Sequence, residues 1–560
     1  MEDINNHSQN STLDKLLEST ENGVKEFAMK QLDRVQRLTQ IGIALSVEKD
    51  VNKLLEMILD EAMRFTNADA GTLYTMDDSE NCLRFEIVKN LSMNTHMGGT
   101  SGLEIDWPPV SLEADGAPNF ANVSSRAALT GDVVRITDVY ETTEYDFSGP
   151  KKYDQQTGYR TKSMLVVPMK NHQNDVIGVL QLLNATDSQK NEVIPFAEED
   201  KDMIASLASQ AAVALENAQL IRDLQALFEA FIQSIATAID EKSKYTAGHI
   251  RRVTELTMMI AETINESDSG LYKDINFSTG ELEELRIAAW MHDIGKIVTP
   301  EYVVDKSHKL ETIFDRIELV KTRFEMIKQL KTTEFLNQKV KMLQNGGIKS
   351  ENFRELEAQH KAELTLLDNE MKFVVQCNTA SEFMDDERLE RLRQIGQKTY
   401  TIDGQEYEYL TEDECYNLSI RRGTLNFEER KIIENHAMVS IKMLRQLPFP
   451  KKFAHVPDYA GGHHEKLDGS GYPFGLTADQ LALQSKILAI ADIFEALTAK
   501  DRPYKSPMKL SQAVGILKKM CDQNHIDHDL YRLFIESGVY KKYAEKELNP
   551  EQVDVIEAEA

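Results

Sequence analysis

The stretch AAWMHDIGKI (288–297) decides the fold of the larger part of the chain, because it ends an apolar helical run with an adjacent histidine and aspartate. A second stretch, GGHHEKLDGSGYP (461–473), places two adjacent histidines before a loop that is rich in turn-forming residues. In a third, AIADIFEAL (489–497), Asp492 interrupts an apolar helical run. Because burying a carboxylate is costly unless it is paired or binds a metal, these stretches together predict a helical domain built around a metal site.

The number of candidate ligands indicates two cations rather than one. Besides the stretches quoted above, His436 lies in EERKIIENHAMVS (428–440) and His249 lies in YTAGHIRRV (245–253). A lone histidine on an apolar face is usually an ordinary core residue, so the prediction depends on the whole set. Histidine and carboxylate ligands suit iron, manganese or zinc, and their number exceeds what a single catalytic zinc uses. The candidate metal ligands are His249, His292, Asp293, His436, His463, His464 and Asp492.

Two such metals suit in-line displacement at phosphorus, and Asp293 is placed to bridge them. Lys296 follows Asp293 by one helical turn, so it is expected on the same face, where it can stabilise a phosphate oxygen. We therefore expect Asp293 and Lys296 to be catalytic. The expected substrate-binding residues, besides Lys296, are Tyr472 in the glycine-rich loop and the pair Arg502 and Lys505 in DRPYK. A solvated turn would explain the last two equally well.

Charge and composition exclude several classes of protein. The chain has 560 residues, of which 64 are lysine or arginine and 92 are aspartate or glutamate, so its net charge is −28. Such an acidic chain is a poor candidate for non-specific binding to nucleic acid or to an anionic membrane. An anionic substrate would therefore need local cations.

Cysteine usage and apolar segments indicate the expected compartment. The polar start MEDINNHSQNSTLDK (1–15) has no apolar segment of a secretory signal, and the run from Met203 to Leu215 is too short to span a bilayer. The spacing of the four cysteines argues against a disulfide framework. They are Cys82, Cys377, Cys415 and Cys521. We expect a soluble, cytoplasmic protein.

The first half of the chain changes from helical to strand periodicity and back. A polar segment (1–37) is expected to be loose over residues 1–30, and apolar residues recur at helical spacing from about 31 to 65. Helical spacing returns from Ala197, and this order predicts an antiparallel α+β domain over 38–218. The β-rich runs between the helices are AGTLYTM (70–76), CLRFEIV (82–88), GDVVRITDV (131–139), SMLVVPM (163–169) and DVIGVLQLLN (175–184).

The helix that leaves this domain (219–240) carries a regular apolar seam. Its members step by three and four residues, which is typical of a heptad. Two interpretations stay open: a parallel coiled coil that makes the protein a homodimer, or an ordinary amphipathic helix packed on the next domain. The residues of the seam are Ile221, Leu224, Phe228, Phe231, Ile235 and Ala238.

The remainder (241–545) is predicted to be all-α, with an insertion over about 309–422 and an acidic tail at 546–560. The first part of the insertion is charged and periodic and is broken by NGG (345–347), which predicts an antiparallel helical hairpin. YTIDGQEYEYL (400–410) is typical of a β-hairpin that turns at its Asp-Gly pair. The sequence leaves open whether the insertion covers the site or mediates assembly.

HDIGK (292–296) followed by HHEKLDGSGYP (463–473) resembles the HD-GYP subfamily of HD-domain phosphohydrolases. The similarity extends through YTAGHIRRV (245–253), LNFEERKIIENH (425–436) and KILAIADIFEALTAKDRPYK (486–505). The resemblance implies a phosphodiesterase that opens cyclic di-GMP to linear pGpG, in many members with further cleavage to GMP. It also implies a centre of two or three iron or manganese ions.

The resemblance assigns all the candidate ligands to this centre, with His436, His463 and His464 around the second metal. Lys296 corresponds to the lysine that contacts the scissile phosphate. Tyr245 stands where members with three metals have glutamate, so two metals are expected here. The residues that correspond to substrate contacts are Tyr472, Arg502 and Lys505.

The N-terminal domain resembles a GAF domain of the type found in cyclic-nucleotide phosphodiesterases. The resemblance lies in ADAGTLYTM (68–76), CLRFEIVKN (82–90), TGYRTKSMLVVPMKN (157–171) and VIGVLQLLNATD (176–187). GAF domains bind small molecules or dimerise. The motif of the cyclic-nucleotide-binding members is incomplete, because Asn184 is followed by alanine and Asp200 by lysine, although Phe196 is present. A bound cyclic nucleotide and an unliganded dimerising module both stay open.

The sequence thus predicts a multidomain protein: an N-terminal α+β GAF domain joined by a long helix to an all-α HD-type phosphohydrolase domain with a helical insertion. The expected function is hydrolysis of cyclic di-GMP, regulated by the GAF domain. Two alternatives stay open, a hydrolase of a related cyclic dinucleotide such as cyclic GMP-AMP and a non-catalytic adaptor that binds diguanylate cyclases. The complete ligand set favours the enzyme.

Overall fold

The chain divides into two compact units, Met1–Leu227 and Phe228–Ala560, and each is described by itself. The computed structural model describes residues 10–554 apart from a few gaps. These gaps are residues 49, 78, 188, 191, 243–247, 269, 345–349, 381–382 and 500–506.

The N-terminal unit begins with two helices, α1 (Asn10–Val47) and α2 (Val51–Thr66). The expectation that residues 1–30 are loose is wrong for residues 10–30, which are helical because they are rich in good helix formers such as leucine, lysine and glutamate. The expected helix over 31–65 is also two helices rather than one. Asp50 interrupts it, since its side chain caps α2 by accepting hydrogen bonds from the backbone N–H groups of the first turn.

An antiparallel sheet forms the centre of this unit, with the strand order β3-β2-β1-β9-β8-β7. Each predicted run contains a strand, and short strands that the sequence did not suggest extend the edges. The strands of this sheet are β1 (Ala68–Asp77), β2 (Cys82–Asn90), β3 (Thr95–Gly98), β4 (Val110–Ser111), β7 (Val134–Ile136), β8 (Met164–Lys170), β9 (Val176–Thr186) and β10 (Val193–Ile194). A separate small hairpin pairs β5 (Glu113–Ala114) with β6 (Ala117–Pro118).

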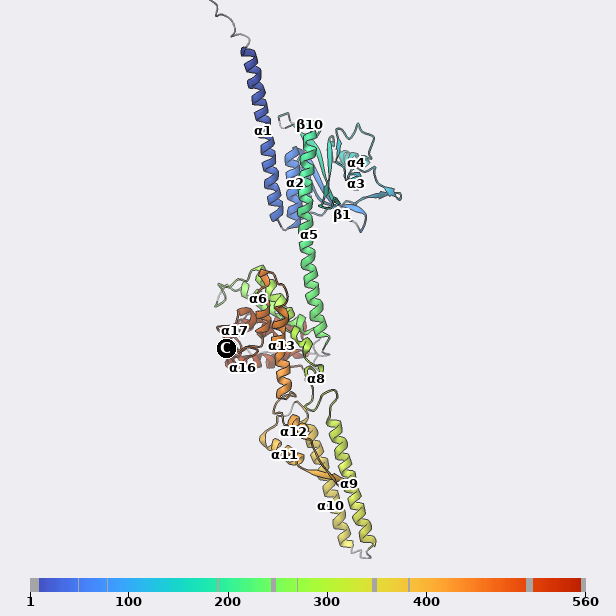
Figure 1. The fold of residues 1–560 in the computed structure, drawn as a ribbon, viewed down its shortest axis with the longest axis vertical. Coiled ribbons are helices and arrows are strands. Elements are labelled where there is room, and N and C mark those ends of the chain that lie inside the picture. Colours follow the sequence, from blue (N-terminus) through green and yellow to red (C-terminus); the bar gives the residue numbers. More distant parts are fainter. Residues whose placement is uncertain are drawn as a thin grey trace, which may run out of the picture. The chain divides into compact units, whose positions relative to one another are not determined.

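Helices cover both faces of the sheet. Helix α2 and the first half of α5 (Glu198–Asp240) lie on one face, and α3 (Val123–Thr130) and α4 (Ser148–Thr157) lie on the other (Figure 1). Each face has its own apolar core, one around Leu73 and Leu180 and the other around Val166 and Val179. The predicted antiparallel α+β domain is therefore confirmed.

Helix α5 continues without a break from the first unit into the second. From Phe228 on it packs on the second unit, where the Phe228 ring stacks on Phe453 and Ile232 and Ile239 are buried. The interpretation as an amphipathic helix packed on the next domain is therefore right for this part of the seam. Leu224 and Phe231 are 66% and 58% exposed, so they do not contribute to that packing.

The second unit is helical around one main core that includes Val253, Leu256, Phe494 and Phe534. This confirms the predicted all-α domain. Its helices outside the insertion are α6 (His249–Asn265), α7 (Thr279–Met291), η1 (Ile294–Val298), α13 (Phe427–Leu444), η2 (Lys451–Phe453), α14 (Val456–Gly461), α15 (Leu483–Thr498), α16 (Leu510–Asp522), α17 (His528–Glu536), α18 (Val539–Glu547) and η3 (Pro550–Gln552).

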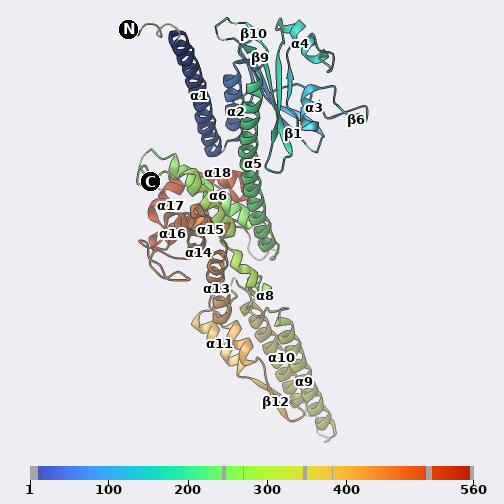
Figure 2. The same cartoon turned by 45° about the horizontal axis from the view of Figure 1, so that its top comes forward.

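The insertion has a core of its own, which includes Phe324, Val374 and Leu392. Helices α9 and α10 lie side by side as the predicted hairpin (Figure 2), joined by an ion pair between Lys339 and Glu357. The NGG turn at 345–347 lies outside the described residues. The short helix α8 (Glu301–Val304) precedes the insertion, whose elements are α9 (Ile317–Gln344), α10 (Ser350–Cys377), α11 (Asp386–Gly396), β11 (Thr399–Ile402), β12 (Gln405–Glu408) and α12 (Glu412–Leu418).

The predicted β-hairpin is also present, and Asp403 and Gly404 turn it with φ of 50° and 82°. Positive φ at both turn positions is the geometry that Asp-Gly pairs favour. At the base of the insertion, the Lys306 ammonium contacts both carboxylate oxygens of Glu429 on α13, each at 2.8 Å. The Lys306 side chain is fully buried, so this contact fixes the insertion to the helix that carries His436.

None of the helices in the described part of the chain is long and apolar enough to cross a membrane.

Candidate metal centre

The candidate ligands come from the ends and the middle turns of several helices that pack together. His249 begins α6, His292 and Asp293 lie between α7 and η1, and His436 lies within α13. His463 and His464 follow α14, and Asp492 lies within α15. The first and last of these residues are far apart in the chain, so only the packing of α6 against α15 brings them together.

Backbone carbonyls orient three of the histidine rings. The Nδ1 atoms of His292, His436 and His463 lie 2.7, 2.5 and 2.6 Å from the carbonyl oxygens of Ala289, Ile433 and Ala460. Each carbonyl is three residues earlier on the preceding helical turn. If Nδ1–H donates to the carbonyl, Nε2 is left with its lone pair, which is how metal-binding histidines are usually held.

The atoms that these rings direct inward are buried. The Nε2 atoms of His292, His436 and His463, and Oδ1 of Asp293, have no hydrogen-bond partner among the described residues. Buried polar atoms normally have a partner, because leaving one unsatisfied costs about 1–3 kcal/mol. A cation would give all four atoms a partner at once, so the donor set fits a metal.

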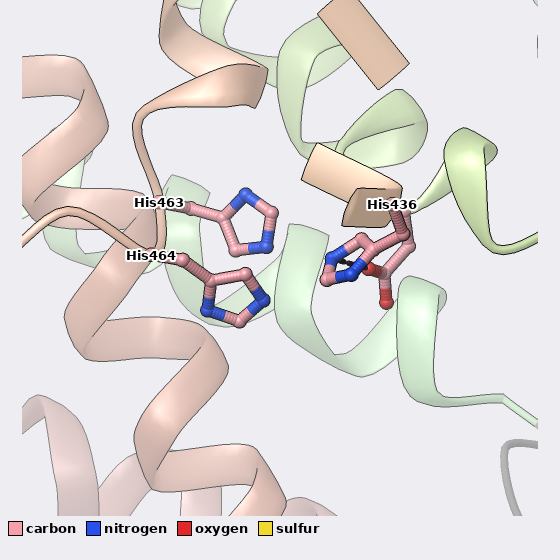
Figure 3. A group of neighbouring side chains, drawn as sticks. His436, His463 and His464 are labelled. Atoms are coloured by element: carbon pink, nitrogen blue, oxygen red, sulfur yellow. Dashed lines mark ion pairs between the residues drawn. The ribbon is translucent and has the colours of Figure 1, made fainter. Parts of the chain in front are cut away.

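The ligand atoms form two groups that share Asp293. One group is Asp293, His436, His463 and His464, and the other is His249, His292 and Asp293. Within each group all ligand atoms lie within 4.8 Å of one another. In Figure 3 the rings of His463 and His464 face that of His436, whose Nε2 is 3.3 Å from Asp293 Oδ1.

Asp492 lies beside the second group. Its Oδ1 is 3.3 Å from Nε2 of His249 and 3.9 Å from Nε2 of His292. Nε2 of His292 is also 3.3 Å from Asp293 Oδ2. The structure therefore brings all the sequence-predicted ligands to one place, with a carboxylate between the two groups.

Gly295 is required where the histidine–aspartate turn meets α13. A Cβ atom at this position would lie 2.0 Å from the carbonyl oxygen of His436 and 2.6 Å from the backbone nitrogen of Ser440. The Gly295 N–H donates to the Ser440 hydroxyl at 2.9 Å, and that hydroxyl donates to the His292 carbonyl at 2.9 Å. This close approach fixes Asp293 relative to His436.

Burial and neighbouring charges set the protonation of the centre. Burial lowers the pKa of His463 well below its usual range and that of His464 to about 3, so both rings are neutral. Burial alone would raise the pKa of Asp293, but Lys296 and His292 outweigh it and lower that pKa well below its usual value. Neutral imidazoles and an ionised carboxylate are the forms that bind metals.

His249 has a different environment from the other rings. Burial opposes its charged form, but the carboxylates of Glu495 and Asp293 outweigh this and raise its pKa well above its usual value. Its Nδ1 lies 2.5 Å from Glu495 Oε2, and Arg252 Nε donates to the other oxygen of Glu495 at 2.7 Å. Glu495 therefore orients His249 as the carbonyls orient the other rings.

Glu495 and Arg252 were not predicted from the sequence. Each lies three residues after a candidate ligand on the same helix, Glu495 after Asp492 and Arg252 after His249. Residues three apart share one helix face, so this spacing was a usable signal.

The predicted substrate contacts are placed in part. The Lys296 ammonium lies 2.5 Å from Asp293 Oδ2, and its side chain is 28% exposed at the edge of the centre. The ring of Tyr472 lies 4.7 Å from that of His464, and burial, followed by the nearby carboxylates, raises the pKa of its phenol. Arg502 and Lys505 lie outside the described residues, as does Tyr245.

The N-terminal unit contains a separate cavity of about 360 Å³. Aromatic rings line it, and the Trp107 ring meets those of Phe85 and Tyr153 edge to face. Lys89 also lines the cavity, but its ammonium pairs with Glu56 and Asp60. The lining residues that this description uses are Tyr74, Phe85, Lys89, Trp107, Tyr153, Tyr159 and Gln181.

The residues of the incomplete cyclic-nucleotide motif serve the fold of this unit. Asn184 accepts a hydrogen bond from the Lys162 N–H and donates to the Arg160 carbonyl. Phe196 is buried in the core, and Asp200 accepts a hydrogen bond from a backbone N–H at the start of α5. Their presence is therefore explained without a ligand.

Comparison with known families divides the chain in the same way. Residues 50–215 match the GAF domain family, and residues 246–367 and 412–530 match families described as HD domain. The chain therefore contains a GAF domain followed by an HD domain.

Curated relatives named as cyclic-dinucleotide phosphodiesterases are similar to this chain over only a small part of their own length. A 3′3′-cGAMP-specific phosphodiesterase 1 of Vibrio cholerae is 37% identical over 116 residues, which are 21% of this chain and 26% of the relative. A cyclic di-GMP phosphodiesterase of Pseudomonas aeruginosa is 34% identical over 120 residues, which are 21% and 28% of the two chains. The chain thus spans about a quarter of the length of these curated relatives.

Solved structures of GAF-domain proteins are also similar to about a third of this chain. The GAF domain of an Acinetobacter phosphoenolpyruvate-protein phosphotransferase is 14% identical and covers 34% of this chain and 96% of its own, with a TM-score of 0.24. A GAF domain/HD domain protein of Geobacter sulfurreducens is 16% identical and covers 31% and 98%, with a TM-score of 0.22.

Proposed function

Because this chain belongs to the proteins that join a GAF domain to an HD domain, we propose that it is a metal-dependent phosphodiesterase of the HD-GYP type that hydrolyses cyclic di-GMP. The observation that carries the proposal is the set of buried imidazole and carboxylate atoms around Asp293, which lie close together and lack hydrogen-bond partners among the described residues. The relatives named as cyclic di-GMP phosphodiesterases support the choice of substrate.

The donor set supports two cations. Asp293, His436, His463 and His464 would hold one, and His249, His292 and Asp293 would hold the other, with Asp492 beside the second. Histidine and carboxylate donors suit iron, manganese or zinc, and the resemblance to the HD-GYP subfamily favours iron or manganese. When bound, two such cations supply an activated water and neutralise charge on the phosphoryl oxygens.

The chain's own residues position the substrate and balance charge. The positively charged ammonium of Lys296 lies at the edge of the centre. An incoming phosphodiester would replace part of the contact between this ammonium and Asp293. Tyr472 keeps its proton, because of its raised pKa, and can donate a hydrogen bond from beside His464. Arg502 and Lys505 remain proposed substrate contacts. The proposed product is linear pGpG, with GMP as the product of a second cleavage.

A related cyclic dinucleotide is a second candidate substrate. Relatives from Vibrio cholerae are named as 3′3′-cGAMP-specific phosphodiesterases, at identities similar to those of the cyclic di-GMP relatives. An adaptor that binds diguanylate cyclases without catalysis is a weaker candidate, because the seven donors come together here.

A substrate panel tests the proposal. The full chain would be purified anaerobically, its iron, manganese and zinc content measured, and linear products followed by chromatography with cyclic di-GMP, 3′3′-cGAMP and a linear pGpG control. We expect two metals per chain and release of pGpG from cyclic di-GMP. A chain that carries its metals and cleaves no cyclic dinucleotide contradicts the enzyme, and binding of a diguanylate cyclase by that chain would favour the adaptor.

We also propose that the GAF domain regulates this activity through a ligand in its aromatic cavity. The ring-lined walls suit a planar molecule, and a cyclic nucleotide is the candidate that the sequence suggested. Isothermal titration of cyclic AMP and cyclic GMP into the full chain tests this. No heat with either nucleotide would leave the dimerising module as the role of the domain.

A homodimer is proposed from the exposed part of α5. Leu220, Leu224, Leu227 and Phe231 are each more than half exposed and step by four, three and four residues, so they form a heptad seam beside the one first predicted. Sedimentation of the full chain and of the Leu224→Glu, Leu227→Glu double variant tests it. A monomeric parent chain would contradict the dimer.

We propose the same domain boundaries that the sequence predicts. They are 1–37 for the polar N-terminal segment, 38–218 for the GAF domain, 219–240 for the connecting helix, 241–545 for the HD domain with its insertion at about 309–422, and 546–560 for the acidic tail.

All four cysteines, each among the described residues, are free thiols. Free thiols are usual in a reducing compartment, which supports the proposed cytoplasmic location.

A further inference from the structure

Lys242 makes an unusual set of contacts just after α5 ends. Its ammonium donates to the backbone carbonyls of Lys296 at 3.0 Å, Thr299 at 2.7 Å and Ile297. An ammonium has three protons to donate, so these contacts use its full capacity. Its carbonyl partners all belong to η1 and the residue that caps it.

These carbonyls lie at the C-terminal end of a short helix, where carbonyl oxygens keep lone pairs for further donors. The Lys296 carbonyl also accepts from the Thr299 N–H at 3.0 Å. A cation at this end is favourable because the helix dipole is negative there. The other end of the same turn is fixed differently, by the hydrogen bond from Gly295 to Ser440 of α13. The turn that carries Lys296 is thus held at both ends, by α13 at Gly295 and by Lys242 at its last residues.

We propose that Lys242 is a positioning residue for Lys296. Lys296 must keep its ammonium against Asp293, at 2.5 Å, while its backbone lies in a single 3₁₀ turn that has little stability alone. Lys242 fixes that backbone through the carbonyl of Lys296 itself. The kinetic part of this inference rests on the proposed function, whereas the ordering of the turn does not.

The same contact connects α5 to the metal centre. Helix α5 ends at Asp240, and its last turn is anchored by Ile239, which is buried in an apolar cluster that includes residues of α7 and α14. Lys242 follows two residues later, so a rotation or shift of the end of α5 moves the ammonium relative to the three carbonyls. A change in this helix therefore reaches Lys296 through Lys242.

The experiment uses the full, metal-loaded chain and five variants, one of them a control. Lys242→Met keeps the aliphatic part of the side chain and removes the ammonium, and Lys242→Arg keeps a cation. Lys296→Met and the double variant Lys242→Met, Lys296→Met complete a double-mutant cycle. Lys452→Met is the matched control, because Lys452 makes an ion pair with Glu283 on the surface of the same unit.

We expect Lys242→Met to lower kcat roughly ten- to a hundredfold, as a displaced catalytic group does, with KM and metal content unchanged. Lys242→Arg should recover most of the loss, and Lys452→Met should change kcat less than about twofold. In the Lys296→Met background, Lys242→Met should have almost no further effect, because it acts through Lys296. Equal losses in both backgrounds would overturn the positioning role.

Hydrogen exchange separates this inference from the proposed function. In the full chain, Lys242→Met should speed exchange of the backbone amides of 294–299 by about tenfold or more, without changing the exchange of α16. This readout needs no substrate. If the parent chain cleaves no cyclic dinucleotide but the exchange changes as expected, the proposed function fails and the ordering of the turn stands. Unchanged exchange at 294–299 would overturn the inference, whatever the activity.

Discussion

The HD metal centre and the GAF cavity bury polar groups in opposite ways. In the centre, the inward atoms of His292, His436 and His463 have no hydrogen-bond partner within the described parts of the chain. In the cavity, polar groups bond to one another: the Tyr74 hydroxyl donates to Gln181 at 2.8 Å, and that of Tyr159 donates to Asp69 at 2.8 Å.

The chemistry of a ligand can be inferred where the buried polar groups of its site lack hydrogen-bond partners. A cluster of buried lone pairs without hydrogen-bond partners fits a cation, so the centre indicates the chemistry of its ligand. A cavity whose polar groups are already satisfied constrains only the size and flatness of what enters. The chemistry of any molecule that the GAF cavity binds is therefore less determined than that of the metal centre.

The largest effect is expected from Asp293→Asn, because this residue belongs to both ligand groups. The amide keeps the shape but loses the charge, so both cations lose a carboxylate ligand. We expect activity to fall by more than about a thousandfold and metal content to fall with it. Elemental analysis and a turnover assay measure both. A variant with full metal content and near-normal turnover would break the contrast.

Metal removal should destabilise the second unit and leave the first unchanged. The two tryptophans of the chain separate the signals, because Trp107 lines the GAF cavity and Trp290 lies on α7 beside the centre. In Trp107→Phe, chelation should lower the free energy of unfolding seen by Trp290 by about 3–4 kcal/mol, the effect of losing a ligand present at some thousand times its Kd.

The matched variant Trp290→Phe leaves Trp107 to report on the GAF domain. Its thermal transition should be the same with and without chelator. A shift of the Trp107 transition as large as that of Trp290 would mean that the cation binds elsewhere or that the two units unfold together.

Glu495→Gln should weaken metal binding without removing a ligand. The amide can no longer accept from both His249 and Arg252 as a charged group, so His249 loses its fixed orientation. We expect metal affinity to fall roughly 10–100-fold, as is usual when a partner of a metal-binding histidine is changed. Competition with a coloured chelator measures it. Unchanged affinity would remove His249 from the ligand set.

The smallest effect is expected in the cavity. Gln181→Leu removes the acceptor of the buried Tyr74 hydroxyl and should destabilise the GAF domain by about 1–2 kcal/mol. Urea unfolding followed by Trp107 in the Trp290→Phe background measures this. Metal content should stay the same, and a loss of metal in this variant would contradict the separation of the two sites.

Some features could be read from local sequence, because the physical cause is local. The β-rich runs at 163–169 and 175–184, bounded by turn-forming residues, became β8 and β9. The Asp403-Gly404 pair gave the expected hairpin, since its backbone preference does not depend on distant contacts. The polar composition of residues 1–30 predicts a loose segment, but residues 10–30 are helical because they have good intrinsic helix propensity.

The seam on α5 shows the limit of periodicity. Spacing marked Phe228 and Leu224 as equivalent, yet Phe228 stacks on Phe453 while Leu224 is exposed. A repeat of three and four residues predicts one apolar face but does not say which surface that face will meet. The surface that each turn of α5 packs against depends on where the second unit begins along the helix.

The sequence by itself determined the kinds of ligand and the elements that carry them, because a buried carboxylate or a run of histidines in apolar helices is costly without a cation. Only the tertiary structure decided that Asp293 is shared, that three Nε2 atoms point inward, and that Glu495 reaches His249 from 246 residues away. The reason is physical: propensity and periodicity act over a few residues, whereas a metal site forms where helices distant in sequence pack against each other.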